Sequence, residues 1–166
     1  MSHPTPAPDP EVITIGVQDG QYVLESSPLR NNAWPDPSDG LTTGEENWLA
    51  VITGTQWGDV SVEVHVLTSP PATLDTEWEM VVERDLATKS GEIAIRDLYS
   101  VPPIYTVRLS PGLLRVRVHV RGRSGTPPET SSASPAETHL IQMWPVKHES
   151  PATILAGPDS TARSYR

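Results

Sequence analysis

Two segments of this chain alternate apolar and polar residues so regularly that they constrain the fold more than any other feature. In WGDVSVEVHVL (57–67), every second residue from 60 to 66 is valine. In GLLRVRVHVRGR (112–123), one leucine and three valines alternate with three arginines and one histidine. A period of two residues is typical of a half-buried strand, because successive side chains point to opposite faces of a sheet. Both segments are therefore predicted to be core strands of an antiparallel sheet.

The remaining apolar segments are also short and β-like. Asp19-Gly20 is a two-residue turn signal between two of them, and it predicts a hairpin. Pro 18 and Gly 11, with Phe 0, describe a chain that is broken too often for long helices. Because sheets with one apolar face bury it against each other, we predict an all-β fold, an antiparallel β-sandwich of eight or nine strands, with a closed barrel as the alternative. The other expected strands are 11–17, 21–26, 48–55, 77–87, 90–98, 104–110 and 137–144.

The length of 166 residues predicts one domain, which we place at residues 11–144. Residues 1–10 are predicted to be a disordered Pro-rich arm, and residues 145–166 a flexible tail. Cys 0 excludes disulfides and thiolate metal sites and fits a reducing compartment. No segment resembles a signal peptide or reaches the apolar length of a membrane span, so we expect a cytoplasmic protein.

Charge is distributed unevenly along the chain. Residues 1–83 hold 14 Asp and Glu against one Arg, which gives -13, whereas residues 84–166 hold 7 against 11, which gives +4. If folding keeps the two sets on separate surfaces, the acidic surface repels phosphate backbones and attracts a basic protein. We therefore predict a basic protein partner, such as a nuclease or toxin, and neither free nucleic acid nor a membrane.

A long loop, residues 27–47, combines an aromatic residue with several acids. An exposed tryptophan among carboxylates has the composition of an interface anchor with an electrostatic rim. Further acids follow the second strand pair, in the segment before residue 80. The predicted partner-binding residues are Trp34, Asp36, Asp39, Glu45, Glu46, Asp75, Glu77 and Glu79.

The basic stripe of the second alternating segment admits several interpretations. Four arginines (115, 117, 121 and 123) could follow a phosphate backbone, but no aromatic residues are interleaved for base stacking. The favoured interpretation is a solvated face, or one that meets the acidic half of the chain. Glu63 opposite Arg115 or Arg117 would then be an ordinary cross-strand ion pair.

Histidines suggest an alternative function. His65, His119 and His139 could converge on one sheet face and bind a divalent metal, with Glu63 as a fourth ligand. No tight ligand spacing such as HExxH supports this site, so we predict no metal and no cofactor.

Patterns of catalysis are few. The chain has no GxSxG, no Walker-type loop and no GxGxxG. The pairs Glu77/Glu79 and Glu83/Asp85 lie at i, i+2 and could serve as acid and base, although such pairs are usually solvated. We therefore expect a protein that is not an enzyme.

The order of segments over residues 77–144 resembles the competence protein J family. The stretches that carry the resemblance are VVERDLA, SGEIAI, LSPG, LLRVRVHVRG and ETHLIQMW, with a long polar loop before the last. The resemblance implies a small non-catalytic protein that inhibits a nuclease, as the family does for the nuclease that cuts DNA during uptake. The expected function is thus an acidic binding protein of the nuclease-inhibitor or immunity type, and the alternative is a sandwich that binds a small ligand or metal.

Overall fold

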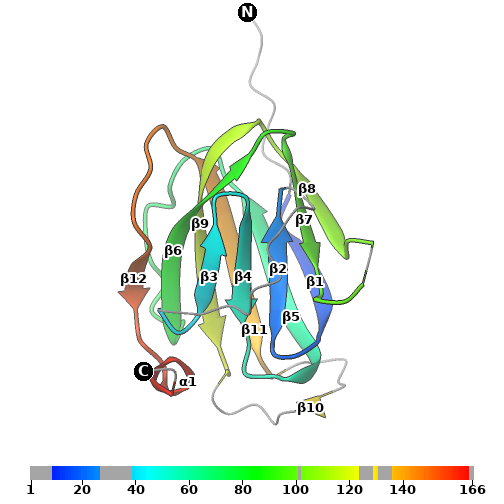
Figure 1. Ribbon diagram of the computed structural model, residues 1–166. Helices are drawn as coiled ribbons and strands as arrows, with labels where there is room; N and C mark the ends of the chain where they lie inside the picture. Colours follow the sequence, from blue (N-terminus) through cyan, green and yellow to red (C-terminus); the bar gives the residue numbers. More distant parts are fainter. Residues whose placement is uncertain (1–8, 27–38, 101, 124–128, 131–135, 165–166) are drawn as a thin grey trace, which may run out of the picture.

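The computed structural model describes residues 9–26, 39–100, 102–123, 129–130 and 136–164, which form two packed β-sheets (Figure 1). The larger sheet has seven strands: six run in the order β1-β5-β11-β9-β6-β12, and the short β10 pairs with the start of β5. Their bounds are Glu11–Val17 (β1), Trp57–Val66 (β5), Met80–Thr88 (β6), Gly112–Arg121 (β9), Glu129–Thr130 (β10), Thr138–Pro145 (β11) and Thr153–Ala156 (β12).

The smaller sheet has five strands in the order β3-β4-β2-β7-β8. Their bounds are Gln21–Glu25 (β2), Thr42–Glu45 (β3), Trp48–Ile52 (β4), Glu92–Arg96 (β7) and Tyr105–Arg108 (β8). All pairs in this sheet are antiparallel, and in the larger sheet only β10 and β11 run parallel to β5. The all-β prediction is confirmed, with two mostly antiparallel sheets.

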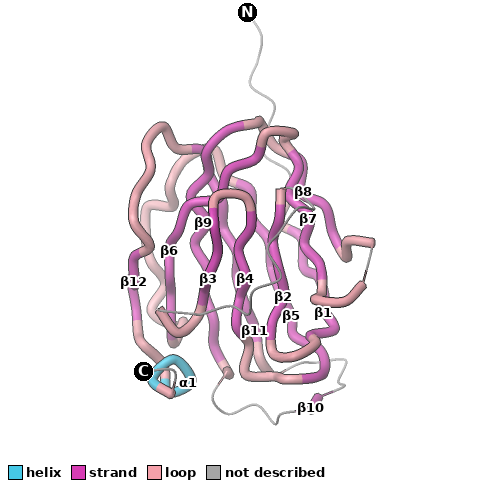
Figure 2. The backbone as a smooth tube through the Cα atoms, viewed as in Figure 1, coloured by secondary structure: helices cyan, strands magenta, loops and turns pink. Residues whose placement is uncertain are grey.

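The described part of the chain has twelve strands rather than eight or nine. The three strands outside the nine predicted ranges, β3, β10 and β12, lie in segments that were predicted to be loop or tail. Each has only two to four residues, so none shows an alternation long enough to recognise. Figure 2 shows how strands dominate the fold, with one short helix, α1 (Ser160–Arg163), near the C-terminal end.

Apolar side chains on the facing sides of the two sheets form the core. The valines of β5 at 60, 62 and 64 and the apolar residues of β9 at 114, 116, 118 and 120 are all at most 3% exposed. From the smaller sheet, Leu24, Leu49 and Ile95 are fully buried against them. Full burial of such a side chain stabilises a fold by roughly 1.5–3 kcal/mol before entropy is counted. Both periodic segments are thus core strands, as predicted.

A chain of polar side chains crosses this core and links the sheets. The Tyr22 hydroxyl on β2 lies 2.8 Å from Nδ1 of His139 on β11, and Nε2 of His139 lies 2.6 Å from Oε2 of Glu137. Oε1 of Glu137 accepts hydrogen bonds from the amides of Gly54 (3.0 Å) and Thr55 (2.8 Å). The side chains of Tyr22, His139 and Glu137 are at most 1% exposed. Burial of these polar groups is tolerated because each has hydrogen-bond partners.

The C-terminal segment differs from the predicted flexible tail. Residues 146–164, which we call the strap, run along the edge of the larger sheet, where β12 pairs with β6 and α1 follows (Figure 1). Because β12 has only four residues, its sequence carries no periodic signal. Its position depends on partners that are distant in the sequence.

Arg123 anchors the far end of the strap. Its guanidinium donates to both carboxylate oxygens of Asp159, at 2.6 and 3.0 Å, and to the carbonyls of Gly40 and Ile52. The Arg123 side chain is fully buried. A Cβ on Gly54 would lie 1.9 Å from the Arg123 carbonyl oxygen, so only glycine lets the two backbones approach this closely.

Candidate functional site

A groove of about 610 Å³ opens where the two sheets meet at one edge of the sandwich. One wall is the turn between β3 and β4, and the opposite wall is the strap at residues 149–152. Strand β6 and the start of β9 form the floor between them. The lining residues are Gly44, Glu45, Glu46, Arg84, Asp85, Leu113, Glu149, Ser150, Pro151 and Ala152.

Carboxylates surround this groove. Glu45 and Glu46 are exposed on the first wall, and Glu149 is exposed on the second. Since the three side chains face solvent from opposite walls, the recess between them attracts cationic groups. The first wall is fixed to the floor, because the Ala87 amide donates to the Glu46 carbonyl at 2.8 Å.

Arg84 supplies the one cationic side chain among the described lining residues. Its guanidinium donates to Oγ1 of Thr42 at 3.2 Å and lies 3.5 Å from the Gly44 carbonyl, on the inner side of β3. Burial lowers the pKa of Arg84, and the nearby Asp39 carboxylate opposes that effect. An arginine keeps its charge under such conditions, so the floor is cationic and the rim is anionic.

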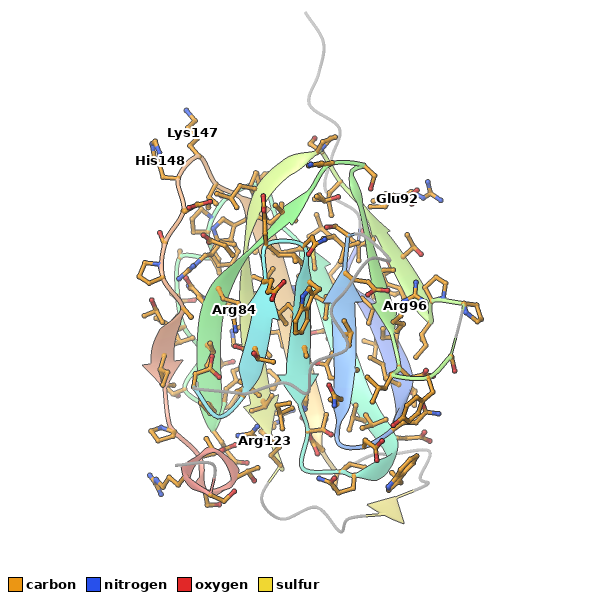
Figure 3. All side chains as sticks on the ribbon, viewed as in Figure 1. Arg84, Glu92, Arg96, Arg123, Lys147 and His148 are labelled. Atoms are coloured by element: carbon orange, nitrogen blue, oxygen red, sulfur yellow. The ribbon has the colours of Figure 1, made fainter. Side chains whose placement is uncertain are left out.

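The strap wall is held by Arg115, which is 6% exposed. Its Nη1 donates to Oδ1 of Asp85 at 2.9 Å and to the Ser150 carbonyl at 3.0 Å, and its Nη2 donates to the Pro151 carbonyl at 2.8 Å. Oδ2 of Asp85 accepts from the Ser150 amide at 2.8 Å. In Figure 3, Lys147 and His148 mark the tip of the loop that leads into this wall, and Arg84 lies on β6.

The predicted acidic residues fall into separate places. Glu45 and Glu46 line the groove, whereas Asp75, Glu77 and Glu79 are exposed just before β6 begins, at the opposite end of that strand from the groove. Glu77 lies 2.9 Å from Nη1 of Arg121, and Glu79 accepts from the Gly122 amide at 2.7 Å. Trp34 and Asp36 lie outside the described residues.

Asp39 does not face a partner. Its Oδ1 accepts from the amides of Leu41 and Thr42 at 2.7 and 2.6 Å, and its Oδ2 accepts from the Thr42 hydroxyl at 2.6 Å. The side chain is 9% exposed and orders the entry into β3, a local role that aspartate often has in turns. Asp39 thus has a local structural role, and its predicted contact with a partner stays a prediction.

The basic stripe of β9 is not a solvated face. Arg115 and Arg117 are buried, and they pair with Glu83 and Asp85 across the β6–β9 ladder. Glu63, the predicted partner, lies on β5, and β11 separates β5 from β9. Of the acids that the stripe meets, Glu77 and Glu83 belong to the acidic half of the chain, as the second interpretation expected. The others, Asp85 and Asp159, belong to the second half.

The histidines do not share a face. In the β9–β11 register His139 lies opposite Val120 and faces the core, whereas His119 lies opposite Leu140 and faces outward. His119 is 2% exposed, and its Nδ1 lies 2.9 Å from the Leu140 carbonyl. His65 lies 3.0 Å from Glu63 on β5. The predicted convergence is therefore wrong, and among the described residues no group of three or more His, Asp or Glu could hold a metal ion.

The carboxylate pairs weighed as acid and base have other partners. Glu83 and Asp85 are engaged by Arg115 and Arg117, and Glu77 and Glu79 contact the end of β9.

Within the residues that the structure describes, no helix is long and apolar enough to cross a membrane.

Comparisons with known proteins agree with this architecture. No protein-family model matches the chain, and no curated protein sequence matches it. The fold is similar to that of ComJ from Bacillus subtilis, an inhibitor of the DNA-degrading activity of NucA. The TM-score is 0.62 at 12% identity, over 85% of this chain and 98% of ComJ. It is also similar to the crocagin biosynthetic gene J product, with a TM-score of 0.52 at 14% identity, over 84% of this chain and 99% of that one.

The resemblance to the competence protein J family is thereby confirmed at the level of the fold. It extends over most of the chain, beyond the residues 77–144 that carry it in the sequence. At these identities the similarity concerns the fold, and function is a separate question.

Proposed function

We propose that this chain is a non-enzymatic protein of the inhibitor type, which binds a basic protein partner such as a nuclease through the acidic groove. The observation that carries the proposal is the ring of exposed carboxylates, Glu45, Glu46 and Glu149, around one recess. Similarity of the fold to ComJ, an inhibitor of the DNA-degrading activity of NucA, supports the class of partner. We expect it to act in the cytoplasm and without a cofactor.

The electrostatics of the groove suit this role. A nuclease holds DNA through cationic side chains, and a surface with three exposed carboxylates competes for the same cations. Such complementarity raises association rates from about 10⁵–10⁶ to as much as 10⁸–10⁹ M⁻¹s⁻¹ at low salt. Affinity would come from the apolar part of the lining, Leu113 and Pro151, once the partner excludes water.

The other predicted acids extend the negative field. Asp75, Glu77 and Glu79 lie along the same edge of the larger sheet, beyond β12, where they would attract the partner at longer range. Trp34 and Asp36 belong to the loop that precedes the first groove wall in the sequence. We propose Trp34 as the aromatic anchor of the complex.

A nuclease-inhibition assay tests the proposal. The purified chain is titrated into DNA-degradation reactions of NucA and of basic nucleases from the organism that carries this chain, and binding is measured in parallel at low and high salt. We expect inhibition of at least one nuclease, reduced by Glu45→Gln/Glu46→Gln. The matched control is Asp9→Asn/Glu11→Gln, which removes two charges at the opposite edge of the larger sheet. Failure to bind or inhibit any nuclease, or equal effects of both double variants, overturns the proposal.

A further inference from the structure

The second groove wall is attached to the sandwich by side chains rather than by a strand ladder. Residues 149–152 come before β12, whose pairing with β6 begins at Thr153. The Ser150 amide and carbonyl and the Pro151 carbonyl have Asp85 and Arg115 as partners, within 3.0 Å. The position of this wall therefore depends on the Arg115–Asp85 pair.

Arg115 joins three parts of the molecule in one guanidinium. Its Nε lies 3.2 Å from Oε1 of Glu83, its Nη1 reaches Asp85 on the groove floor, and both of its terminal nitrogens reach the strap. A planar fork of five donors satisfies such a set of acceptors, whereas a lysine ammonium with three donors does not. The arrangement uses chemistry that is particular to arginine.

The two ends of the strap are fixed independently. Val146 donates to the Leu113 carbonyl at 3.0 Å, and Asp159 pairs with Arg123 near α1. Loss of the Arg115 contacts would therefore release the wall while the rest of the strap stays attached. Opening such contacts locally costs less free energy than unfolding the whole domain.

From this geometry we infer that Arg115 is the positioning residue of the acidic groove, which keeps Glu149 opposite Glu45 and Glu46 so that both walls hold one cationic segment of the partner. The inference rests on the proposed function and deepens it. Partner affinity then depends on a buried residue that the partner never touches. Arg115 belongs to the basic stripe of β9, and it fixes one wall of the acidic groove by donating to the backbone carbonyls of Ser150 and Pro151.

Arg117 provides a matched control on the same strand face. Its Nε donates to Oε2 of Glu83 at 2.7 Å, and its guanidinium lies over the Trp144 ring at 5.4 Å. It shares Glu83 with Arg115, but it contacts Glu83 and Trp144 of the sheet, whereas Arg115 also contacts the strap. Arg117→Gln therefore perturbs the same ionic cluster without releasing the wall.

The experiment compares Arg115→Gln, Arg115→Lys and Arg117→Gln with the unaltered full chain. Native-state hydrogen exchange reports the Ser150 amide, and surface-immobilised octa-arginine serves as the binding probe. We expect Arg115→Gln to exchange Ser150 about tenfold faster or more and to bind the probe about fivefold more weakly at low salt, mainly through slower association, with Arg115→Lys between it and the unaltered chain. Arg117→Gln should leave both quantities within about twofold.

The outcomes separate the two hypotheses. If the unaltered chain does not bind octa-arginine, or binds it unchanged after Glu45→Gln/Glu46→Gln, the proposed function fails. If the unaltered chain binds but Arg115→Gln and Arg117→Gln weaken binding equally, Arg115 has only a structural role and this inference fails. This inference also fails if Ser150 exchange accelerates with no change in affinity for octa-arginine. Should Arg115→Gln not fold, the comparison of Arg115→Lys with Arg117→Gln decides in the same way.

Discussion

Arg123 and Asp159 form a forked ion pair inside the protein, with Nη2–Oδ1 and Nε–Oδ2 distances of 2.6 and 3.0 Å. Their side chains are 0% and 2% exposed. Asp159 also caps α1, since its Oδ1 accepts from the Ala162 amide at 2.8 Å. One pair therefore connects β9, the entry to β3 and the end of the strap.

Removing one partner of this pair should destabilise the fold strongly. Asp159→Ala leaves a buried, uncompensated guanidinium, and we expect a loss of about 3–5 kcal/mol in the free energy of unfolding. Urea unfolding followed by tryptophan fluorescence measures it. The control is Glu92→Ala, because Glu92 and Arg108 form an exposed pair 2.8 Å apart, whose loss should cost less than about 1 kcal/mol. Equal effects of the two variants would contradict the anchoring role.

The polar chain across the core predicts a second stability effect. The Tyr22 hydroxyl and Nδ1 of His139 are hydrogen-bonded at 2.8 Å, and Nε2 of His139 is hydrogen-bonded to Glu137 at 2.6 Å. Tyr22→Phe leaves a buried nitrogen without that partner, so we expect a loss of about 1–3 kcal/mol. Tyr105→Phe is the control, because the Tyr105 ring packs against the core and its hydroxyl has no partner among the described residues. A smaller loss for Tyr22→Phe than for the control would refute the linking role.

Glu137 lies at the end of this hydrogen-bonded series, and its titration changes the stability of the fold in a defined direction. Burial by itself raises the pKa of the Glu137 carboxyl, but the hydrogen bond and charge of His139, with the Thr55 and Gly54 amides, lower it below the ordinary value. The ionised Glu137 therefore stabilises the fold at pH values above its pKa in the unfolded chain. This stabilisation is lost as pH falls through its pKa in the folded protein. In NMR titration the Glu137 carboxyl should protonate below the ordinary pKa of a glutamate, 4.5. Protonation at or above that pH would refute the assignment.

His119 also makes the free energy of unfolding depend on pH, but through a group that is charged when protonated. Burial lowers its pKa to about 4, although the Leu140 carbonyl opposes the effect. Between about pH 6.5 and pH 4 the unfolded chain binds a proton that the folded protein does not, so stability decreases as pH falls through this window. The shift corresponds to about 2–3 kcal/mol between pH 7.5 and pH 4.5.

Urea unfolding at these two pH values, for the unaltered chain and His119→Leu, isolates this contribution. The variant removes the titrating group, so its stability should change less between the two values, by about 2 kcal/mol. His65→Leu is the control, since His65 is half-exposed on β5 beside Glu63. Identical pH dependence of the unaltered chain and the His119 variant would exclude the assigned role.

The sequence predicts the core more completely than it predicts the groove. Alternation identifies the buried rows of β5 and β9 because burial on one face of a strand follows directly from a period of two. It cannot tell a solvated outer face from a covered one, which is why the arginines of β9 were expected either in water or against the acidic half of the chain. The strap, which covers Arg115, was predicted to be a flexible tail from its Pro, Ser and Ala content.

The residues of the candidate site likewise divide into those that the sequence identifies and those that it does not. Glu45 and Glu46 were identified as acids of the long loop 27–47, and they line the groove. Glu149 was missed, since its closeness to them arises from Arg115 and Asp85 acting across more than thirty residues of sequence. The local hydrogen bonds of Asp39 were not foreseen, because a carboxylate in a loop sequence can bind either a partner or its own backbone.

The acids of the groove should act mainly on the rate at which the partner associates. Glu45 and Glu46 are exposed, so their replacement by glutamine removes long-range attraction without disturbing packing. Against a basic nuclease, we expect Glu45→Gln/Glu46→Gln to lower the association rate constant several-fold at low salt. The dissociation rate constant should change by less than about twofold. Stopped-flow binding over a series of salt concentrations measures both, and the rates of the variant and the unaltered chain should converge at high salt, where the Debye length is about 3 Å. An effect that persists undiminished at high salt, or that falls mainly on dissociation, would mean that these carboxylates make direct contacts and do not steer the encounter.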